Sequence, residues 1–203
     1  MSGFVLAVDT TSELGSIALA QDGRVLEQVA LRSPDGFAHI LFGEIESLLA
    51  RHRVKITDMQ GFAAAGGPGA FTGVRVGLAA VKGLAEATGR LVVAVSNLQA
   101  LASFGTRALR APVIDARRGE VFAALYDSGL RLVSDEVVVK LDAWRAALPP
   151  GDIEMIQDSR ELAGAIATIA AQRFADGLGQ DPSAIDANYV RRSDAELFWR
   201  DKT

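Results

Sequence analysis

The feature that most constrains the fold is a pattern that occurs once near the start of the chain and again after its midpoint. Residues 5–22 read VLAVDTTSELGSIALAQD, and residues 111–127 read APVIDARRGEVFAALYD. Each copy is an apolar run that ends in aspartate, followed by a polar turn and a second apolar run. Short apolar runs bounded by turn residues are typical of buried strands. The repetition therefore indicates two similar halves.

Hydrophobic periodicity predicts further strands and helices around both copies. In the first half we expect strands at 3–9, 14–20, 24–31, 61–65 and 91–95, with helices at 36–50, at 71–88 and from residue 97. In the second half we expect a third strand at 130–139, a helix at 141–148 and a last helix from near Ser159 to Ala175. Hairpins mixed with crossovers make an α/β protein. We place the lobe boundary near residues 104–110, which gives lobes of 1–104 and 105–203.

Composition narrows the functional classes. The chain has 203 residues, no cysteine and a net charge of −4, which excludes a disulfide scaffold, a thiolate zinc site and a cysteine nucleophile. The acidic balance argues against free-standing nucleic-acid binding, because phosphate contacts require clustered Lys and Arg. No apolar run approaches the roughly 18 residues that span a bilayer, and the start MSGFVLAVDT lacks a basic signal region. We expect a cytoplasmic protein outside any membrane.

Eight of the 20 glycines lie in residues 61–89. The run GGPGAFTG at 66–73 invites comparison with phosphate-binding loops, but its register does not fit. A Walker loop has Lys and then Ser or Thr after its last glycine, whereas Val74 and Arg75 follow Gly73 here. The dinucleotide fingerprint needs a shorter final gap and a place after the first strand. We therefore do not expect this loop to be a phosphate cradle.

The same glycines form a stripe on the predicted helix 71–88. Gly69, Gly73 and Gly77 are spaced four apart, and Ala80 follows three residues later. Glycine inside a helix costs roughly 1 kcal/mol relative to alanine, so the stripe requires close approach of another backbone. Either the helix packs tightly on its own sheet, or the stripe faces a second protein. In the second case, a bulky residue at Gly73 or Gly77 is expected to disrupt pairing and to leave the monomer folded.

The predicted helix 36–50 is apolar over a wide arc. A second stripe, formed by Ala38, Phe42, Ile45 and Leu49, lies beside the first. A helix with one buried face needs an apolar arc of only about 100°. The excess favours an exposed patch for a protein partner over burial in a larger core. The candidate partner interface comprises Phe37, Ala38, Leu41, Phe42, Ile45, Leu49, Gly69, Phe71, Gly73, Gly77 and Ala80.

Asp9 and Asp115 each end a predicted strand just before a turn. Aspartates in such places can hold a magnesium-bound phosphate between two lobes, and Thr10 and Thr11 follow the first of them. The plainer interpretation is that each carboxylate accepts hydrogen bonds from turn amides. A nucleotide site formed by Asp9, Thr10, Thr11 and Asp115 is therefore the alternative and not the main expectation.

No metal site and no nucleophile elbow is predicted. His39 and His52 are 13 residues apart, so at 100° per residue they would face away from each other even on one continuous helix. Position 43, one turn after His39, is glycine, so a second ligand is missing there. The sequence also lacks the Gly-x-Ser-x-Gly pattern of a serine nucleophile.

Four blocks resemble the bacterial TsaB (YeaZ) family of tRNA threonylcarbamoyladenosine biosynthesis proteins. They are LAVDTTSELGSIAL, GGPGAFTGVRVG, the tripeptide Ser96-Asn97-Leu98 and VIDARRGEVF. The ending Tyr189-Val190-Arg191 is similar to a family Pro-Tyr-Leu-Arg ending, with Asn188 in place of the proline. The resemblance implies a two-lobed actin-like ATPase fold (ASKHA, ribonuclease-H-like) with mixed sheets. The second lobe looks abridged, because only a short segment separates Pro150 from the last helix.

The resemblance also implies a non-catalytic role beside a related catalytic subunit, TsaD. TsaD transfers a threonylcarbamoyl group to the adenosine next to the anticodon of certain tRNAs and holds a metal with a His-x-x-x-His helix motif. Here His39 is followed by Gly43, so the second ligand is absent. The ATPase TsaE completes the assembly, so ATP and metal are expected on the partner subunits. Proteins of this family pair through their first two helices, with themselves or with TsaD.

The alternative function is a small ATP-binding or kinase-like enzyme of the same superfamily that uses Asp9 and Asp115. tRNA contact is expected only through the complex, given the acidic balance. The residues after Arg192, with Phe198 and Trp199, match no motif of the family.

Overall fold

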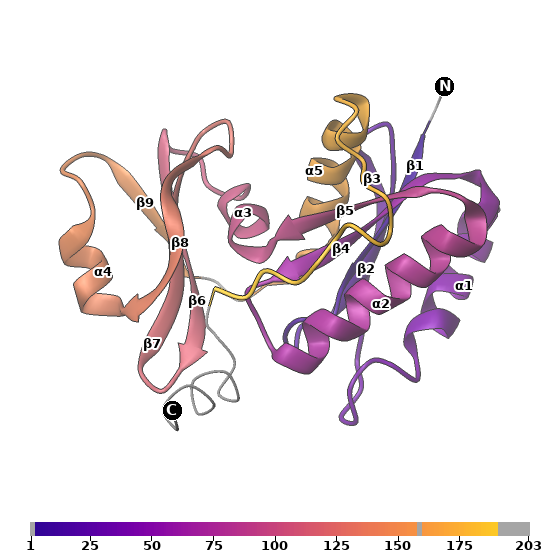
Figure 1. Ribbon diagram of the computed structural model, residues 1–203, viewed down its shortest axis with the longest axis horizontal. Coiled ribbons are helices and arrows are strands. Elements are labelled where there is room, and N and C mark those ends of the chain that lie inside the picture. Colours follow the sequence, from indigo (N-terminus) through magenta and orange to yellow (C-terminus); the bar gives the residue numbers. More distant parts are fainter. Residues whose placement is uncertain (1–2, 158–159, 191–203) are drawn as a thin grey trace, which may run out of the picture.

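The computed structural model describes residues 3–157 and 160–190, which form two lobes, each built on one sheet (Figure 1). The first sheet has the order β3-β2-β1-β4-β5. Strands β1, β2 and β3 pair antiparallel, whereas β1, β4 and β5 run parallel. The bounds are β1 (Phe4–Asp9), β2 (Ser16–Gln21), β3 (Arg24–Ala30), β4 (Met59–Gly67) and β5 (Leu91–Ser96).

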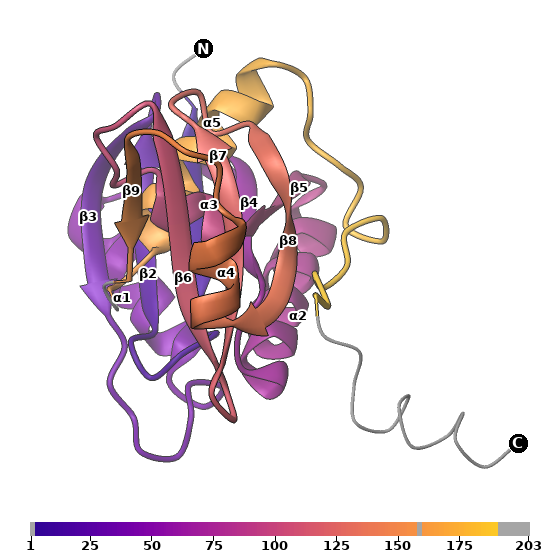
Figure 2. The ribbon, with the colours of Figure 1, turned by 90° about the vertical axis from the view of Figure 1, so that its left-hand side faces the viewer.

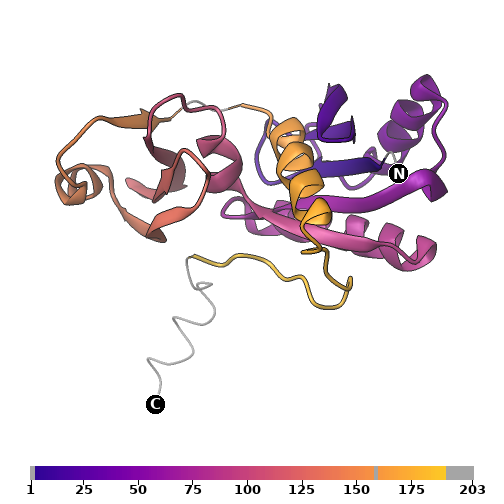
Figure 3. The same ribbon diagram turned by 90° about the horizontal axis from the view of Figure 1, so that it is seen from above.

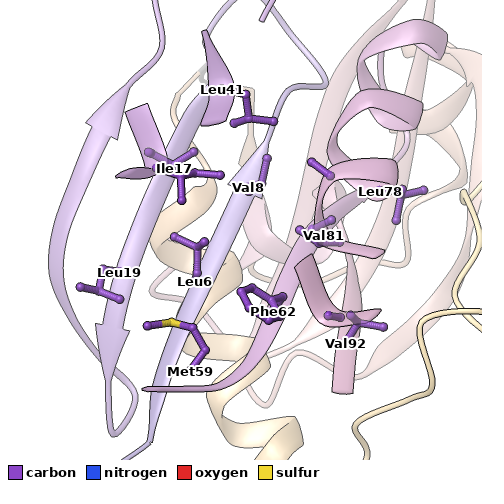
Figure 4. Packing of buried hydrophobic residues seen from close by; sticks show 14 of the residues in the cluster. Leu6, Val8, Ile17, Leu19, Leu41, Met59, Phe62, Leu78, Val81 and Val92 are labelled. Atoms are coloured by element: carbon purple, nitrogen blue, oxygen red, sulfur yellow. The ribbon is translucent and has the colours of Figure 1, made fainter. Parts of the chain in front are cut away.

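Helices α1 (Leu41–His52) and α2 (Phe71–Thr88) cover one face of this sheet. Side chains alternate between the faces of a strand, so Leu6 and Val8 of β1 point toward these helices. Figure 4 shows Val8, Phe62 and Val81 in the layer between sheet and helices. A short helical turn (Ile56–Asp58) leads from α1 into β4.

Helix α5 (Ala163–Ala175) covers the opposite face of the first sheet and contacts all five of its strands (Figure 3). Its Ile166 and Ala170 share one apolar cluster with Val5 and Ala7 of β1. The sequence assigns this helix to the C-terminal lobe of 105–203, and the structure differs. The reason is that a helix packs where its apolar face is complemented, which position along the chain does not reveal. It begins at Ala163, and Ser159 lies outside the described residues.

The second lobe is a sheet of order β8-β7-β6-β9, which faces the viewer in Figure 2. Helix α4 packs on one face through Trp144, and α3 packs on the other through Leu98. Within the described residues, the second sheet has four strands and the first has five, in line with the expectation of an abridged second lobe. The bounds are α3 (Asn97–Ala102), β6 (Leu109–Arg117), β7 (Glu120–Asp127), β8 (Leu132–Lys140), α4 (Leu141–Ala147) and β9 (Ile153–Ile156).

The prediction of an α/β protein with mixed sheets is confirmed, but two elements differ from expectation. Strand β9 was not predicted, because its four residues follow a Pro-Pro-Gly break and are too few to show a period. Helix α1 begins at Leu41 and not at residue 36. The residues before it form a turn, in which the carbonyl oxygen of Phe37 accepts hydrogen bonds from Ile40 N and Leu41 N. In the part of the chain that the structure describes, no helix is both long and apolar enough to cross a membrane.

Candidate functional site

The carboxyl ends of the parallel strands β1, β4 and β5 meet at one edge of the first sheet, which brings Asp9, Gly67 and Asn97 together. Asp9 Oδ1 accepts hydrogen bonds from Thr11 N at 2.9 Å and from Thr11 Oγ1 at 2.6 Å. Thr11 Oγ1 in turn accepts from Asn97 Nδ2, and Asn97 Oδ1 accepts from Gly67 N. Asp9 and Thr11 therefore bond to each other and Thr11 bonds to Asn97, whereas Asp9 Oδ2 is buried and accepts no hydrogen bond from the described residues.

Asp9, Thr10 and Thr11 are all buried. Burial raises the pKa of the Asp9 carboxyl, and the hydrogen bonds from Thr11 oppose that rise only in part. Asp9 Oδ1 thus accepts from an amide of its own turn, as the plainer interpretation expected, and Oδ2 is the part of the carboxyl that this interpretation does not explain.

The glycine stripe of α2 packs against this same turn. An alanine Cβ at Gly73 would overlap the carbonyl oxygen of Thr10, and one at Gly69 would lie 2.8 Å from Thr11 O. At Gly77 the Cβ would lie 2.8 Å from Thr10 Oγ1. Two hydrogen bonds hold the turn against the start of α2. Thr10 Oγ1 donates to Gly73 O at 2.7 Å, and Ala70 N donates to Thr11 O at 2.8 Å.

Of the two interpretations of the stripe, the structure therefore favours packing within the chain. Gly69, Gly73 and Gly77 pack against the β1–β2 turn, and Ala80 is buried in the core beneath α2. Gly77 and Ala80 are buried, which contradicts their assignment as partner-contacting residues, whereas the assignment of the half-buried Gly69 and Gly73 stays a prediction. Glycine is required here because the helix and the turn come within backbone contact.

Asp115 lies at the corresponding place in the second lobe, but its surroundings differ. It is exposed near the end of β6, and its Oδ1 accepts from Arg117 N at 2.8 Å. Among the described residues, no hydrogen bond or ion pair joins Asp115 to the β1–β2 turn. The structure therefore does not link the two predicted halves of a nucleotide site.

The other candidate residues of the partner interface form three groups that differ in burial. Leu41, Ile45 and Leu49 are buried in the core of the first lobe, so their assignment to a partner surface is also corrected. Phe37 is half-buried beside Gly15. Three residues remain exposed: Ala38, Phe42 (55% exposed) and Phe71 (46% exposed).

The exposed residues belong to a surface that we call the α1–α2 face. On α2, this surface comprises Phe71, Arg75, Ala79 and Gly83, which recur every fourth residue and therefore share one side of the helix. No other part of the chain covers the α1–α2 face at its two glycines, because a Cβ at Gly43 or Gly83 would meet no atom within 4 Å. Both helices lie on the same face of the sheet, so both present their outer sides in a common direction (Figure 1). The members are Phe42, Gly43, Phe71, Arg75, Ala79 and Gly83, and Ala38 lies just before α1.

A polar network between the lobes was not predicted. Glu136 of β8 accepts hydrogen bonds from Ser96 Oγ, from Tyr126 OH at 2.7 Å and from Asn188 Nδ2. Burial, with the nearby charge of Glu136, raises the pKa of the Tyr126 phenol. These residues border an interlobe cleft of 630 Å³ together with Arg173. They are scattered along the chain, so no spacing in the sequence reveals them.

The two histidines are not brought together. His39 Nε2 lies 3.4 Å from Ser33 Oγ, and His52 Nε2 lies 2.8 Å from Glu27 Oε2. Across residues 3–157 and 160–190, no group of three or more potential metal-binding His, Asp or Glu side chains occurs.

The two lobes and their hairpins that follow Asp9 and Asp115 define the class of actin-like, ribonuclease-H-like proteins. The family model of TsaD, tRNA N6-adenosine threonylcarbamoyltransferase, matches residues 34–179. The chain is 30% identical to the tRNA threonylcarbamoyladenosine biosynthesis protein TsaB of Bacillus subtilis, over 96% of this chain and 97% of that protein. The identity to TsaB of Escherichia coli is 36%, over 60% of this chain and 54% of that protein.

Among solved structures, YeaZ from Pseudomonas aeruginosa matches with a TM-score of 0.79 and 28% identity. The match covers 92% of this chain and 99% of that one. The chain belongs to the TsaB (YeaZ) family. The resemblance seen in its sequence blocks is thereby confirmed, and so is the fold class that it implied.

Asp9→Asn is expected to flatten the dependence of stability on pH. In the unfolded chain an aspartate loses its proton near its ordinary pKa of about 3.9, whereas the folded chain holds the Asp9 proton to higher pH. Folding then takes up a proton, so the free energy of unfolding falls as pH rises toward the folded-state pKa. Asparagine keeps the Oδ1 acceptor for Thr11 and does not titrate.

Urea denaturation between about pH 4 and pH 8 measures this effect. The free energy of unfolding of the variant, measured relative to that of the parent, should rise with pH and then level off. A difference that stays constant over the whole range would contradict a raised pKa at Asp9.

Proposed function

We propose that this chain is a non-catalytic subunit that supports a TsaD-like threonylcarbamoyltransferase in tRNA modification, and that it docks through the α1–α2 face. The observation that carries the proposal is the exposure of Phe42 and Phe71 on the outer sides of neighbouring helices. Large aromatic side chains at the surface, beside small residues that leave room, are typical of a protein-binding site.

The state of the β1–β2 turn supports a non-catalytic role. In an enzyme of this fold class, groups such as the Asp9 carboxyl and the Thr11 hydroxyl would face a nucleotide. In this chain they bond to each other, Thr11 bonds to Asn97, and the glycine stripe packs against Thr10 and Thr11. The alternative of an ATP-binding enzyme therefore gains no support from the geometry.

Charge and partner chemistry fit the same proposal. The net charge of −4 is unfavourable for binding tRNA alone, so tRNA would be met through the assembled complex in the cytoplasm. ATP and the catalytic metal would be held by the TsaD-like subunit and by a TsaE-like ATPase. The α1–α2 face could also pair with a second copy of the chain, which the same surface would permit in the absence of the catalytic subunit.

Co-purification tests the proposal. The chain and the TsaD-like subunit of the same organism should co-elute in size-exclusion chromatography, and deletion of the chain should abolish threonylcarbamoyl modification of tRNA. Failure to co-elute, together with intact modification in the deletion strain, would show that the proposed role is wrong. Light scattering of the chain alone reports self-pairing in the same experiment.

Complementation separates a supporting subunit from an enzyme. Adding back a chain with Asp9→Asn and Asp115→Asn should restore modification as well as the parent does, because neither carboxylate is assigned a chemical step. Loss of modification with an intact complex would favour the enzyme alternative. Calorimetry gives an independent test, since micromolar binding of Mg-ATP that Asp9→Ala abolishes would favour the same alternative.

A further inference from the structure

The C-terminal segment of the described chain ends against the first turn of α2. The ring of Tyr189 lies 5.6 Å from the ring of Phe71, centroid to centroid, at an interplanar angle of 33°. Arg75 Nε donates a hydrogen bond to Tyr189 OH at 3.0 Å. The guanidinium carbon of Arg75 lies 3.8 Å from the centre of the Phe71 ring. These three side chains form what we call the Phe71–Arg75–Tyr189 stack.

The backbone of this segment is held in place without the help of Tyr189. Val92 and Gln180 exchange two hydrogen bonds of 2.9 Å along the edge of β5. Ile185 is buried in the core of the first lobe. Asn188 N donates to Gly66 O at 2.7 Å, and its side chain donates to Glu136 of the second lobe. The course of the segment past β5 toward the junction of the lobes is visible in Figure 1.

The stack is open to solvent on one side. Phe71 is 46% exposed and Tyr189 is 45% exposed, so each ring buries one part against the stack and leaves the rest uncovered. Aromatic and arginine side chains dominate the energetics of protein interfaces. Side chains fixed before binding lose less conformational entropy when a partner docks. The arrangement therefore provides a pre-ordered aromatic edge at one end of the α1–α2 face.

We propose that Tyr189 is a positioning residue of the partner-binding surface. Together with Arg75 it holds Phe71 in the orientation that the TsaD-like subunit binds, so the C-terminal segment is part of that surface. This inference rests on the proposed function and adds to it a contribution from residues more than a hundred positions after α2 begins. It also gives a role to the tyrosine of the family-like ending, which the α1–α2 face alone does not explain.

Substitutions at Tyr189 separate the roles of ring and hydroxyl. Tyr189→Phe keeps the ring on Phe71 and removes the hydrogen bond from Arg75, so affinity for the TsaD-like subunit should fall about threefold. Tyr189→Ala removes both contacts, and affinity should fall about tenfold. Arg75→Ala combined with Tyr189→Ala should weaken binding by less than the product of the two single effects, because both act through Phe71.

Phe104→Ala is the matched control. Phe104 is 41% exposed, and the guanidinium carbon of Arg160 lies 4.5 Å from the centre of its ring. The two side chains form a similar stack, but this stack borders an interlobe cleft and not α2. Its loss should leave affinity unchanged. Surface plasmon resonance with the full chain gives the dissociation constants, and thermal unfolding should shift by only a few degrees in each variant.

The outcomes distinguish this inference from the proposed function. If the parent chain fails to bind the TsaD-like subunit, the proposed function is wrong. If the parent binds and Phe71→Ala weakens binding, but Tyr189→Ala matches the parent, the positioning role is wrong and the proposed function stands. A graded loss from Tyr189→Phe to Tyr189→Ala, with no change in Phe104→Ala, is the result that supports the inference.

Discussion

Gly73→Ala is expected to lower the free energy of unfolding by about 3 kcal/mol or more, since forced overpacking typically costs about 1–3 kcal/mol and occasionally more. The new Cβ would overlap Thr10 O and would lie 3.1 Å from Thr11 Cα. Both are backbone atoms of the β1–β2 turn, so no side chain can rotate away. This result would reverse the sequence-based expectation that a larger residue at Gly73 leaves the monomer folded.

Gly83→Ala is the matched control on the same helix. A Cβ at Gly83 meets no atom within 4 Å, so the intrinsic preference of helices for alanine should dominate. The variant should be more stable than the parent by about 0.5–1 kcal/mol. Urea denaturation of both variants gives the comparison. Equal stability of the Gly73 variant and the parent would show that α2 does not depend on close approach to the turn.

Phe42→Asp is expected to weaken the complex with the TsaD-like subunit by about 30-fold, which corresponds to about 2 kcal/mol. More than half of the Phe42 side chain is exposed, so its own lobe gains little from it. In a docked complex the same position would bury a charge without a partner, which is unfavourable. Binding should therefore suffer far more than folding.

Leu132→Asp controls for the general effect of adding charge to an exposed apolar position. Leu132 is 52% exposed and lies at the start of β8 in the second lobe, away from α1 and α2. Its variant should bind as the parent does. Isothermal titration calorimetry measures both affinities. Equal losses in the two variants would place the partner surface elsewhere, and no loss in Phe42→Asp would remove α1 from it.

Most strands of both sheets and helix α2 could be predicted from the sequence, because their signals are local. An apolar run that ends in aspartate marks β1 and β6, and Gly89 marks the end of α2 at Thr88. Strand β9 could not be predicted, since its four residues pair with β6 through backbone hydrogen bonds that leave no pattern in so short a run.

The candidate site was less predictable because the direction in which a side chain faces depends on its neighbours in space. Ile45 and Phe42 both lie on the second apolar stripe of the first helix, yet one is buried and the other exposed. The glycine stripe allowed two interpretations for the same reason: its spacing predicts close approach but not which backbone approaches. The interlobe network around Glu136 joins residues far apart in the chain, so only the fold reveals it.

The placement of α5 affects how the chain can be made. During synthesis the five strands of the first sheet emerge well before Ala163–Ala175, the helix that covers one of its faces. Until that helix leaves the ribosome, Val5 and Ala7 lack the cover that Ile166 and Ala170 give them. Partly made chains with exposed apolar surface are prone to aggregate. The N-terminal lobe is thus the last part of the molecule to be completed, and a fragment that stops after the second sheet should not yield a soluble N-terminal lobe.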